Sequence, residues 1–194
     1  MVFRERTYSV LIASASEKFA DSIAALLPST DHWPVNKVSS AGEARRASLE
    51  TPYDLVLINS PLNDEFGSML ACDIADSTSS GVLIFVKNEV YEDVYNKVME
   101  NGVMVVSKPI STQMVVQTLK MMCAARERLR CMEKKQATVE EKIKEIRLVN
   151  KAKWVLIENL SMTEADAHRY IEKQAMDMRL SKQQIAENII KTYK

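Results

Sequence analysis

The stretch Leu55-Val56-Leu57-Ile58-Asn59-Ser60-Pro61 decides the fold, because it is a short run of apolar residues that ends at polar residues and a proline. Strands that are apolar on both faces are typical of a parallel sheet covered by helices on both sides. Similar runs stand at residues 8–13, 35–38, 82–86 and 103–106, with helical patterns at residues 19–27, 41–49, 66–75 and 90–99 between them. This alternation predicts a doubly wound α/β domain with a five-stranded parallel sheet over residues 1–121.

A long helix is predicted after Pro109, because residues 111–159 contain neither proline nor glycine. A heptad pattern runs along it, with a and d positions at Met122, Ala125, Leu129, Met132, Gln136, Val139, Ile143, Ile146 and Asn150. Such a pattern favours a coiled coil, although the two polar a positions weaken the seam. We therefore expect a coiled-coil linker over residues 122–150.

Charges beside this seam favour a parallel homodimer. In a parallel pair, a g residue faces the e residue five positions further along the partner, which gives the pairs Arg128–Glu133, Lys135–Glu140 and Lys142–Arg147. The first two pairs are attractive and the third is repulsive. Packing of an amphipathic helix back onto its own domain stays an alternative.

The last part of the chain predicts a small all-α domain over residues 138–194. Thr163 followed by Asp166, and Ser181 followed by Gln184, are patterns that start helices. Together with the end of the long helix, they predict three helices.

Composition excludes several classes of function. The three cysteines have no CxxC spacing, and the two histidines and four glycines offer no metal cluster and no phosphate-binding loop. We therefore expect no cofactor, no metal and no catalysis. Apolar runs are far shorter than the roughly 20 residues that cross a bilayer, and no leader opens the chain, so we expect a cytoplasmic protein without membrane contact.

The net charge of zero hides an uneven distribution of charge. Residues 1–123 contain 10 Lys and Arg against 15 Asp and Glu, a net −5, whereas residues 124–194 contain 16 against 11, a net +5. A basic end of this kind suits an anionic ligand such as nucleic acid, although a solvated helical surface has the same composition.

The first half resembles the receiver domain of bacterial response regulators in strand order, loop lengths and the residues Ser107-Lys108-Pro109. The resemblance implies an acidic pair after the first strand and a phosphoaccepting aspartate at the end of the third. Here Ser14 and Ala15 replace the acidic pair, Asn59 replaces the acceptor, and Val86 stands in place of a hydroxyl residue. Lys108 alone of the usual set remains, so we expect a degenerate phosphorylation site.

Other carboxylates do not rescue this site. Asp54 starts the third strand, about 16 Å from the strand's other end at 3.3 Å per residue. We interpret Asp64 and Glu65 as solvated loop acids and Glu17 as the capping-box partner of Ser14. Transfer of a phosphoryl group to this domain is therefore not expected.

The C-terminal residues are similar to the ANTAR domain over about 138–194. The specific matches are Ala152-Lys153, Glu164 with Ala167, and the run from Lys173 to Met176, while Trp154 departs from the small residue that many members have. ANTAR domains are three-helix modules that bind RNA and prevent transcription termination, and many follow a receiver through a coiled coil. The resemblance implies an RNA-binding site for hairpin loops in transcript leaders, for which the candidates are Ala152, Lys153, Arg169, Lys173 and Arg179.

Basic side chains suit this role because cations contact phosphates and guanidinium groups stack on unpaired bases. Arg169 and Lys173 are four residues apart and share one helix face. The alternative is that they form ordinary surface pairs with Asp166, Glu172 or Asp177.

The expected function is transcription antitermination by a homodimer, and a protein partner on the receiver-like domain is a further expectation. A DNA-binding response regulator is one alternative, because residues 180–187 resemble the first helix of a helix-turn-helix. Too few residues follow them for a recognition helix, which disfavours that alternative. A dimerisation scaffold without nucleic-acid binding is the other.

Overall fold

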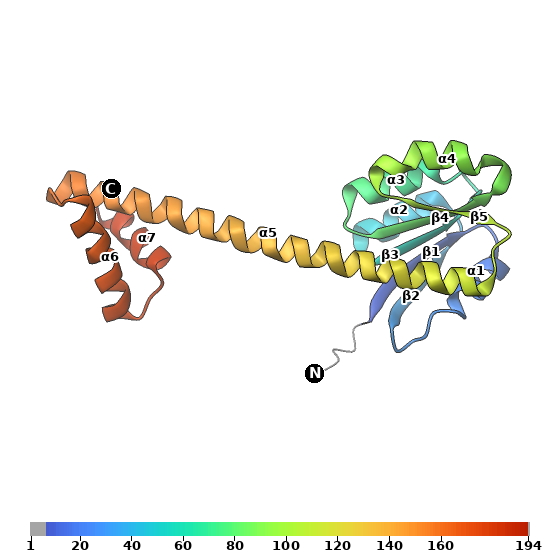
Figure 1. The fold of residues 1–194 in the computed structure, drawn as a ribbon, viewed down its shortest axis with the longest axis horizontal. Helices are drawn as coiled ribbons and strands as arrows, with labels where there is room; N and C mark the ends of the chain where they lie inside the picture. Colours follow the sequence, from blue (N-terminus) through green and yellow to red (C-terminus); the bar gives the residue numbers. More distant parts are fainter. Residues whose placement is uncertain (1–6, 194) are drawn as a thin grey trace. The chain divides into compact units, whose positions relative to one another are not determined.

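The computed structural model describes residues 7–193 (Figure 1). The chain divides into two compact units, one that ends at Leu129 and one that begins at Arg130.

The first unit contains one parallel sheet with the strand order β2-β1-β3-β4-β5 (Figure 1). The strands are β1 (Tyr8–Ser14), β2 (His32–Val38), β3 (Leu55–Asn59), β4 (Gly81–Lys87) and β5 (Met104–Lys108). The connecting helices are α1 (Glu17–Ala24), α2 (Ala41–Glu50), α3 (Ser68–Ser77) and α4 (Tyr91–Val98), with short 3₁₀ helices η1 (Asn88–Val90) and η2 (Met99–Asn101) beside α4. This is the flavodoxin-like order, so the predicted doubly wound sheet is confirmed.

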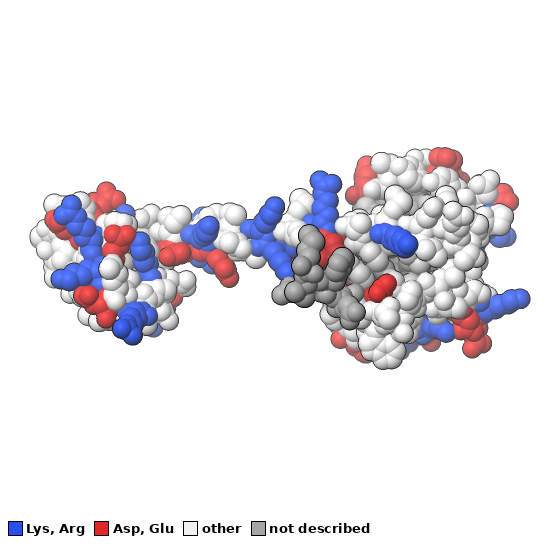
Figure 2. Space-filling model, turned by 60° about the horizontal axis from the view of Figure 1, so that its bottom comes forward, with Lys and Arg blue, Asp and Glu red and all other residues white. Residues whose placement is uncertain are grey.

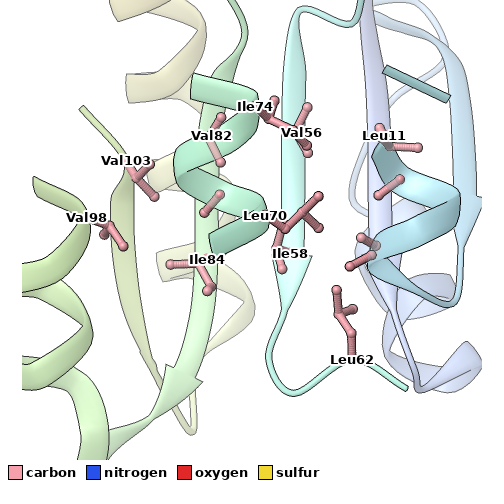
Figure 3. Close-up of a cluster of buried hydrophobic side chains, with 14 of the residues drawn as sticks. Leu11, Val56, Ile58, Leu62, Leu70, Ile74, Val82, Ile84, Val98 and Val103 are labelled. Carbon is pink, nitrogen blue, oxygen red and sulfur yellow. The ribbon is translucent and has the colours of Figure 1, made fainter. Parts of the chain in front are cut away.

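Alternate residues of the central strands feed two separate cores, as expected for a sheet with helices on both faces. Val56 and Ile58 of β3 pack with Leu70 and Ile74 of α3 in the first core (Figure 3). The neighbouring residue Leu57 points to the other face, where the second core includes side chains from α1 and from the start of α5. The continuous apolar run of β3 therefore stabilises both faces of the sheet at once.

The helix α5 (Thr112–Leu160) begins as part of the receiver-like unit. Val115, Leu119 and Met122 are buried in the second core of the sheet. Met122 is therefore a core residue and not the first residue of a dimer seam, because its side chain is already covered by its own domain. The exposed large apolar residues of the seam begin at Leu129.

The second unit is built from the last turns of α5 with α6 (Glu164–Met178) and α7 (Lys182–Thr192). Its core consists of Ala152, Leu156, Ala167, Ile171, Ala175, Ile185, Ala186 and Ile189. The predicted helix starts are confirmed: the Thr163 hydroxyl accepts from the Asp166 N–H, and Ser181 and Gln184 form a complete capping box. The predicted long helix and small three-helix unit are thus both present.

One predicted cap is wrong. The α1 helix starts at Ser16, whose hydroxyl accepts a hydrogen bond from the backbone N–H of Phe19. Ser14 lies two residues earlier, at the end of β1, where it belongs to the site described below. Among residues 7–193, no helix is long and apolar enough to cross a membrane.

Candidate functional site

The carboxyl ends of three strands bring the degenerate receiver residues together. Ser14 ends β1 and Asn59 ends β3, and these two residues are register partners. Lys108 ends β5, two strands from β3. Parallel strands place their carboxyl ends at one edge of the sheet, which is where ligands bind in open α/β folds.

Three of these side chains are joined by hydrogen bonds. Asn59 donates from Nδ2 to the Ser14 hydroxyl oxygen over 3.0 Å, and Lys108 donates from Nζ to Asn59 Oδ1 over 2.8 Å. Lys108 also donates to the backbone carbonyl of Ser60 over 2.6 Å. Ser14 and Asn59 are both buried, so the polar groups of this site largely satisfy one another.

The charge in this site is a single ammonium group held by neutral oxygens. Burial lowers the pKa of Lys108, and the charge of Lys87 lowers it further. Within residues 7–193, no carboxylate forms an ion pair with Lys108. A Mg²⁺ ion prefers several carboxylate oxygens, so a neutral hydroxyl and amide beside a fixed ammonium do not fit a divalent cation.

The remaining positions of the degenerate site are apolar or exposed. Val86 is completely buried in the first core of the sheet, where it packs and offers no polar group. Ala15 is exposed and its methyl side chain has no ligating atom. Among these described residues, the positions of the acidic pair and of the acceptor therefore carry no carboxylate.

The nearby loop acids have structural partners. Asp64 accepts hydrogen bonds from the backbone N–H groups of Ala41 and Gly42 at the start of α2, over 2.7 and 2.9 Å. Glu65 accepts from both terminal nitrogens of Arg45. Asp64 is exposed, as expected of a solvated loop acid, and Glu65 is half-buried. Both acids also have partners that the sequence did not indicate, because each one anchors the β3–α3 loop to α2.

Asp54 lies at the opposite end of the sheet from Asn59, as predicted. Its carboxylate accepts hydrogen bonds from the backbone N–H and the hydroxyl of Ser9 near the start of β1. It therefore contributes to strand pairing.

In the second unit, the two adjacent residues Ala152 and Lys153 have different environments. Ala152 is completely buried in the three-helix core, so the structure gives its side chain a packing role and not a place on the surface. The Lys153 side chain is 16% exposed, and its ammonium pairs with the Glu164 carboxylate over 3.0 Å. This pair joins the end of α5 to the start of α6, a role that the sequence pattern did not indicate.

The outer face of α6 carries the strongest candidate surface for an anion. Arg169 and Lys173 are both exposed there, and within residues 7–193 neither forms an ion pair. Glu172, which could have paired with Arg169, instead accepts a hydrogen bond from Lys182 over 2.6 Å and lies 3.3 Å from His168. The hydrogen bond from Lys182 lowers the pKa of the Glu172 carboxyl, and the charges of Lys182 and His168 lower it further.

Two other acids that could neutralise this face do not do so. The Thr163 hydroxyl donates to the Asp166 carboxylate over 2.6 Å at the start of α6. Asp177 is exposed and makes no ion pair among the described residues. The alternative that Arg169 and Lys173 are simply paired surface residues is thus not what the structure shows.

Arg179 ends α6 in an unusual backbone conformation. Its φ of 54° lies in the left-handed region, and its N–H donates to the carbonyls of Ala175 and Met176. Arg179 is exposed at this turn, where α6 ends. Figure 2 shows basic groups interspersed with acidic ones over this unit.

The described residues contain no cluster of three or more His, Cys, Asp or Glu side chains that could hold a metal ion.

Comparison with known families agrees with this geometry. The family model of the ANTAR domain matches residues 137–190, which include the end of α5, α6 and nearly all of α7. Residues 137–190 are therefore similar to the ANTAR domain, and a domain with the receiver fold precedes them.

A curated relative matches nearly the whole chain. The chain is similar to the transcriptional regulatory protein PdtaR of Mycobacterium tuberculosis, in strains CDC 1551 / Oshkosh and ATCC 25618 / H37Rv alike. The identity is 25% over 185 residues, which span 94% of this chain and 89% of PdtaR.

Solved structures match the first unit. The signal receiver domain of an HD domain-containing protein from Pseudomonas fluorescens Pf-5 has a TM-score of 0.58 and 18% identity, over 67% of this chain and 96% of that one. A CheY-like response regulator receiver domain from Methylobacillus flagellatus has a TM-score of 0.52 and 20% identity, over 60% of this chain and 98% of that one. At these identities the similarity shows the receiver fold alone.

Proposed function

We propose that this protein binds RNA hairpins in transcript leaders through its ANTAR domain and promotes transcription antitermination. The match of residues 137–190 to the ANTAR family supports RNA as the ligand. The name of the relative, a transcriptional regulatory protein, supports a role in gene expression. In this proposal the protein is a non-catalytic regulator. It acts in the cytoplasm, because it binds nascent transcripts there.

The observation that carries this proposal is the outer face of α6. Arg169 and Lys173 lie one turn apart, are exposed, and form no ion pair among the described residues. Glu172, the nearest candidate partner of Arg169, is engaged by Lys182. An exposed cation without a partner loses no existing ion pair when it binds phosphate, so its contribution to affinity is retained. Arg169 can also stack on an unpaired base of a hairpin loop.

Lys153 and Arg179 have supporting roles in the proposed interface. Lys153 is held by Glu164 and orients the junction of α5 and α6, so its contact with RNA requires sharing or breaking that pair. Arg179 extends the basic surface beyond the end of α6. We leave Ala152 out of the interface, since its side chain is in the core.

We further propose that the protein acts as a parallel homodimer through α5. Leu129, Met132, Val139, Ile143 and Ile146 are all exposed large apolar residues. They occupy a and d positions of one continuous heptad repeat, and a second copy of the helix would cover them. The attractive pairs Arg128–Glu133 and Lys135–Glu140 favour a parallel orientation.

The test is a comparison of nucleic acids. Fluorescence anisotropy measures binding of the full chain to a hairpin RNA library with a fixed stem and a randomised loop, and to duplex DNA of equal length. We expect the selected hairpins to bind at least about tenfold more tightly than duplex DNA at the same salt concentration. The double variant Arg169→Ala, Lys173→Ala should lose this preference, whereas Lys97→Ala on the receiver-like domain should keep it.

The other outcomes identify the alternatives. Tighter binding of duplex DNA than of every hairpin would support a DNA-binding regulator. A folded protein that binds neither nucleic acid would support a dimerisation scaffold and contradict our proposal.

A further inference from the structure

Trp154 is a large exposed aromatic side chain that neither the three-helix core nor the basic face of α6 uses. Its side chain is 64% exposed, although its neighbours Ala152 and Leu156 are completely buried. An indole buries roughly 150–250 Å² when it is covered, so leaving it in water forgoes a large apolar contribution. The position of Trp154 on α5 indicates which kind of partner would cover its side chain.

The last turns of α5 have two sides. At about 100° per residue, Ile143, Asn150 and Trp154 project within about 40° of one another, while Ala152 points about 160° away from Trp154. The side with Ala152 and Leu156 packs on α6 and α7. The other side continues the exposed line of Ile143 and Ile146, both of which lie on the proposed dimer seam.

The heptad register identifies the group that Trp154 would meet. Asn150 is an a position, so Lys153 is the next d position and Trp154 is an e position. Lys153 turns to Glu164, so it places no apolar group in the seam. By the g-to-e rule that pairs Arg128 with Glu133, Trp154 faces Val149 of a second copy. Val149 is half-buried against the three-helix core of its own chain, so only the exposed part of its side chain would meet the indole.

We infer that Trp154 packs against a second copy of this chain and extends the dimer interface along α5 beyond Asn150. The inference rests on the homodimer of the proposed function and adds to it a residue outside the predicted linker of residues 122–150. Lys151 and Glu158, with opposite charges, flank Trp154 one turn away on either side, so the indole does not lie in a uniformly basic surface suited to RNA.

The experiment uses the full chain with Trp33→Phe, which leaves Trp154 as the sole tryptophan. Its emission is recorded without RNA across a range of protein concentrations, and sedimentation velocity is measured on the same samples. We expect the emission to shift to shorter wavelength over the same concentrations at which dimers form, because the indole leaves water.

Two substitutions make the test quantitative. Trp154→Ala should raise the dimer dissociation constant by about tenfold or more, and Trp154→Phe should recover most of the affinity. Because Trp154 is exposed, both variants should keep the helical circular dichroism of the wild type. Trp33→Ala is the matched control on the receiver-like domain and should leave the dissociation constant unchanged.

The inference is overturned if dimers form while the emission stays constant, or if Trp154→Ala dimerises like the wild type. An emission change that appears only on addition of hairpin RNA would assign Trp154 to base stacking instead. A wild-type chain that stays monomeric would remove both the inference and the proposed dimer, while RNA binding by that monomer would leave the antitermination proposal standing.

Discussion

Lys108 donates a hydrogen bond to the Asn59 side-chain oxygen over 2.8 Å, where a receiver has its phosphoaccepting carboxylate. Asn59 in turn donates to Ser14, so three strand ends are linked without any acidic group. A neutral amide is a poor nucleophile. The amide oxygen of Asn59 also accepts a hydrogen bond from the Lys108 ammonium group. The linkage indicates that this edge of the sheet has a structural role in this protein.

The first prediction concerns phosphorylation. Incubation of the protein with acetyl phosphate and Mg²⁺ should produce no acyl phosphate, because Ser14, Ala15 and Asn59 provide neither a nucleophile nor metal ligands. Asn59→Asp should also remain unmodified, since it restores the nucleophile without the metal cage. Intact-mass spectrometry is the measurement. A stoichiometric gain of about 80 Da in the wild type, absent from Asn59→Ala, would contradict this account of the site.

The second prediction concerns Asp64 and pH. Hydrogen bonds from the backbone N–H groups of Ala41 and Gly42 hold the pKa of the Asp64 carboxyl below its usual range. A lowered pKa stabilises the fold above the unfolded-state pKa, and this stabilisation is lost as the pH falls through the folded-state pKa. Asp64→Ala should therefore lower the urea midpoint at pH 7, and the difference from wild type should shrink below about pH 4. Glu100→Ala is the control. An equal pH dependence of the urea midpoint in both variants would refute the stabilising role of the Asp64 hydrogen bonds at the start of α2.

Much of the fold was predictable because it depends on local patterns. The apolar run of residues 55–58 predicts a strand buried on both faces, and Val56 and Leu57 do serve opposite cores. The pattern Ser181 with Gln184 likewise predicts a helix start, since both halves of the capping box use groups three residues apart. These features need no knowledge of distant contacts.

The errors come from contacts between residues distant in sequence. Met122 fits the heptad, but it packs on the sheet because the core of β3 and β4 requires an apolar neighbour there. Asp64 looks like a free loop acid until α2, more than 20 residues earlier, presents its N-terminal N–H groups. The pairing of Lys182 with Glu172, which leaves Arg169 unpaired, depends on how α7 folds back against α6.

The third prediction concerns dimerisation. Ile143→Asp combined with Ile146→Asp places two charges in each copy of the proposed seam, where burial would desolvate them. Sedimentation equilibrium at tens of micromolar protein should then show monomers, whereas the wild type should be dimeric. Lys144→Asp on another side of α5 is the matched control and should stay dimeric. The proposed dimer seam is contradicted if the double variant is still a dimer.

The fourth prediction separates stability from binding at Arg179. Non-glycine residues in the left-handed region pay a penalty of about 1 kcal/mol, so Arg179→Gly should raise the free energy of unfolding by up to about 1 kcal/mol. Arg179→Ala keeps the penalty and should leave stability nearly unchanged. Both variants should weaken hairpin RNA binding to the same extent, since both remove the guanidinium group. Unequal losses of binding would mean that the turn, and not the charge, supports the interface.

The most direct test of RNA recognition by α6 is a salt titration of hairpin binding. For contacts to loop RNA, each phosphate contributes about −0.7 to the slope of log K against log salt concentration, so Lys173→Ala should flatten the slope by about 0.7 for cognate and scrambled loops alike. Arg169→Ala should instead reduce the preference for the cognate loop over the scrambled one. Circular dichroism checks that both variants are folded, and Lys97→Ala should match the wild type. If the folded Lys173→Ala and Arg169→Ala variants bind both RNAs with wild-type affinity and slope, the outer face of α6 is not the RNA interface.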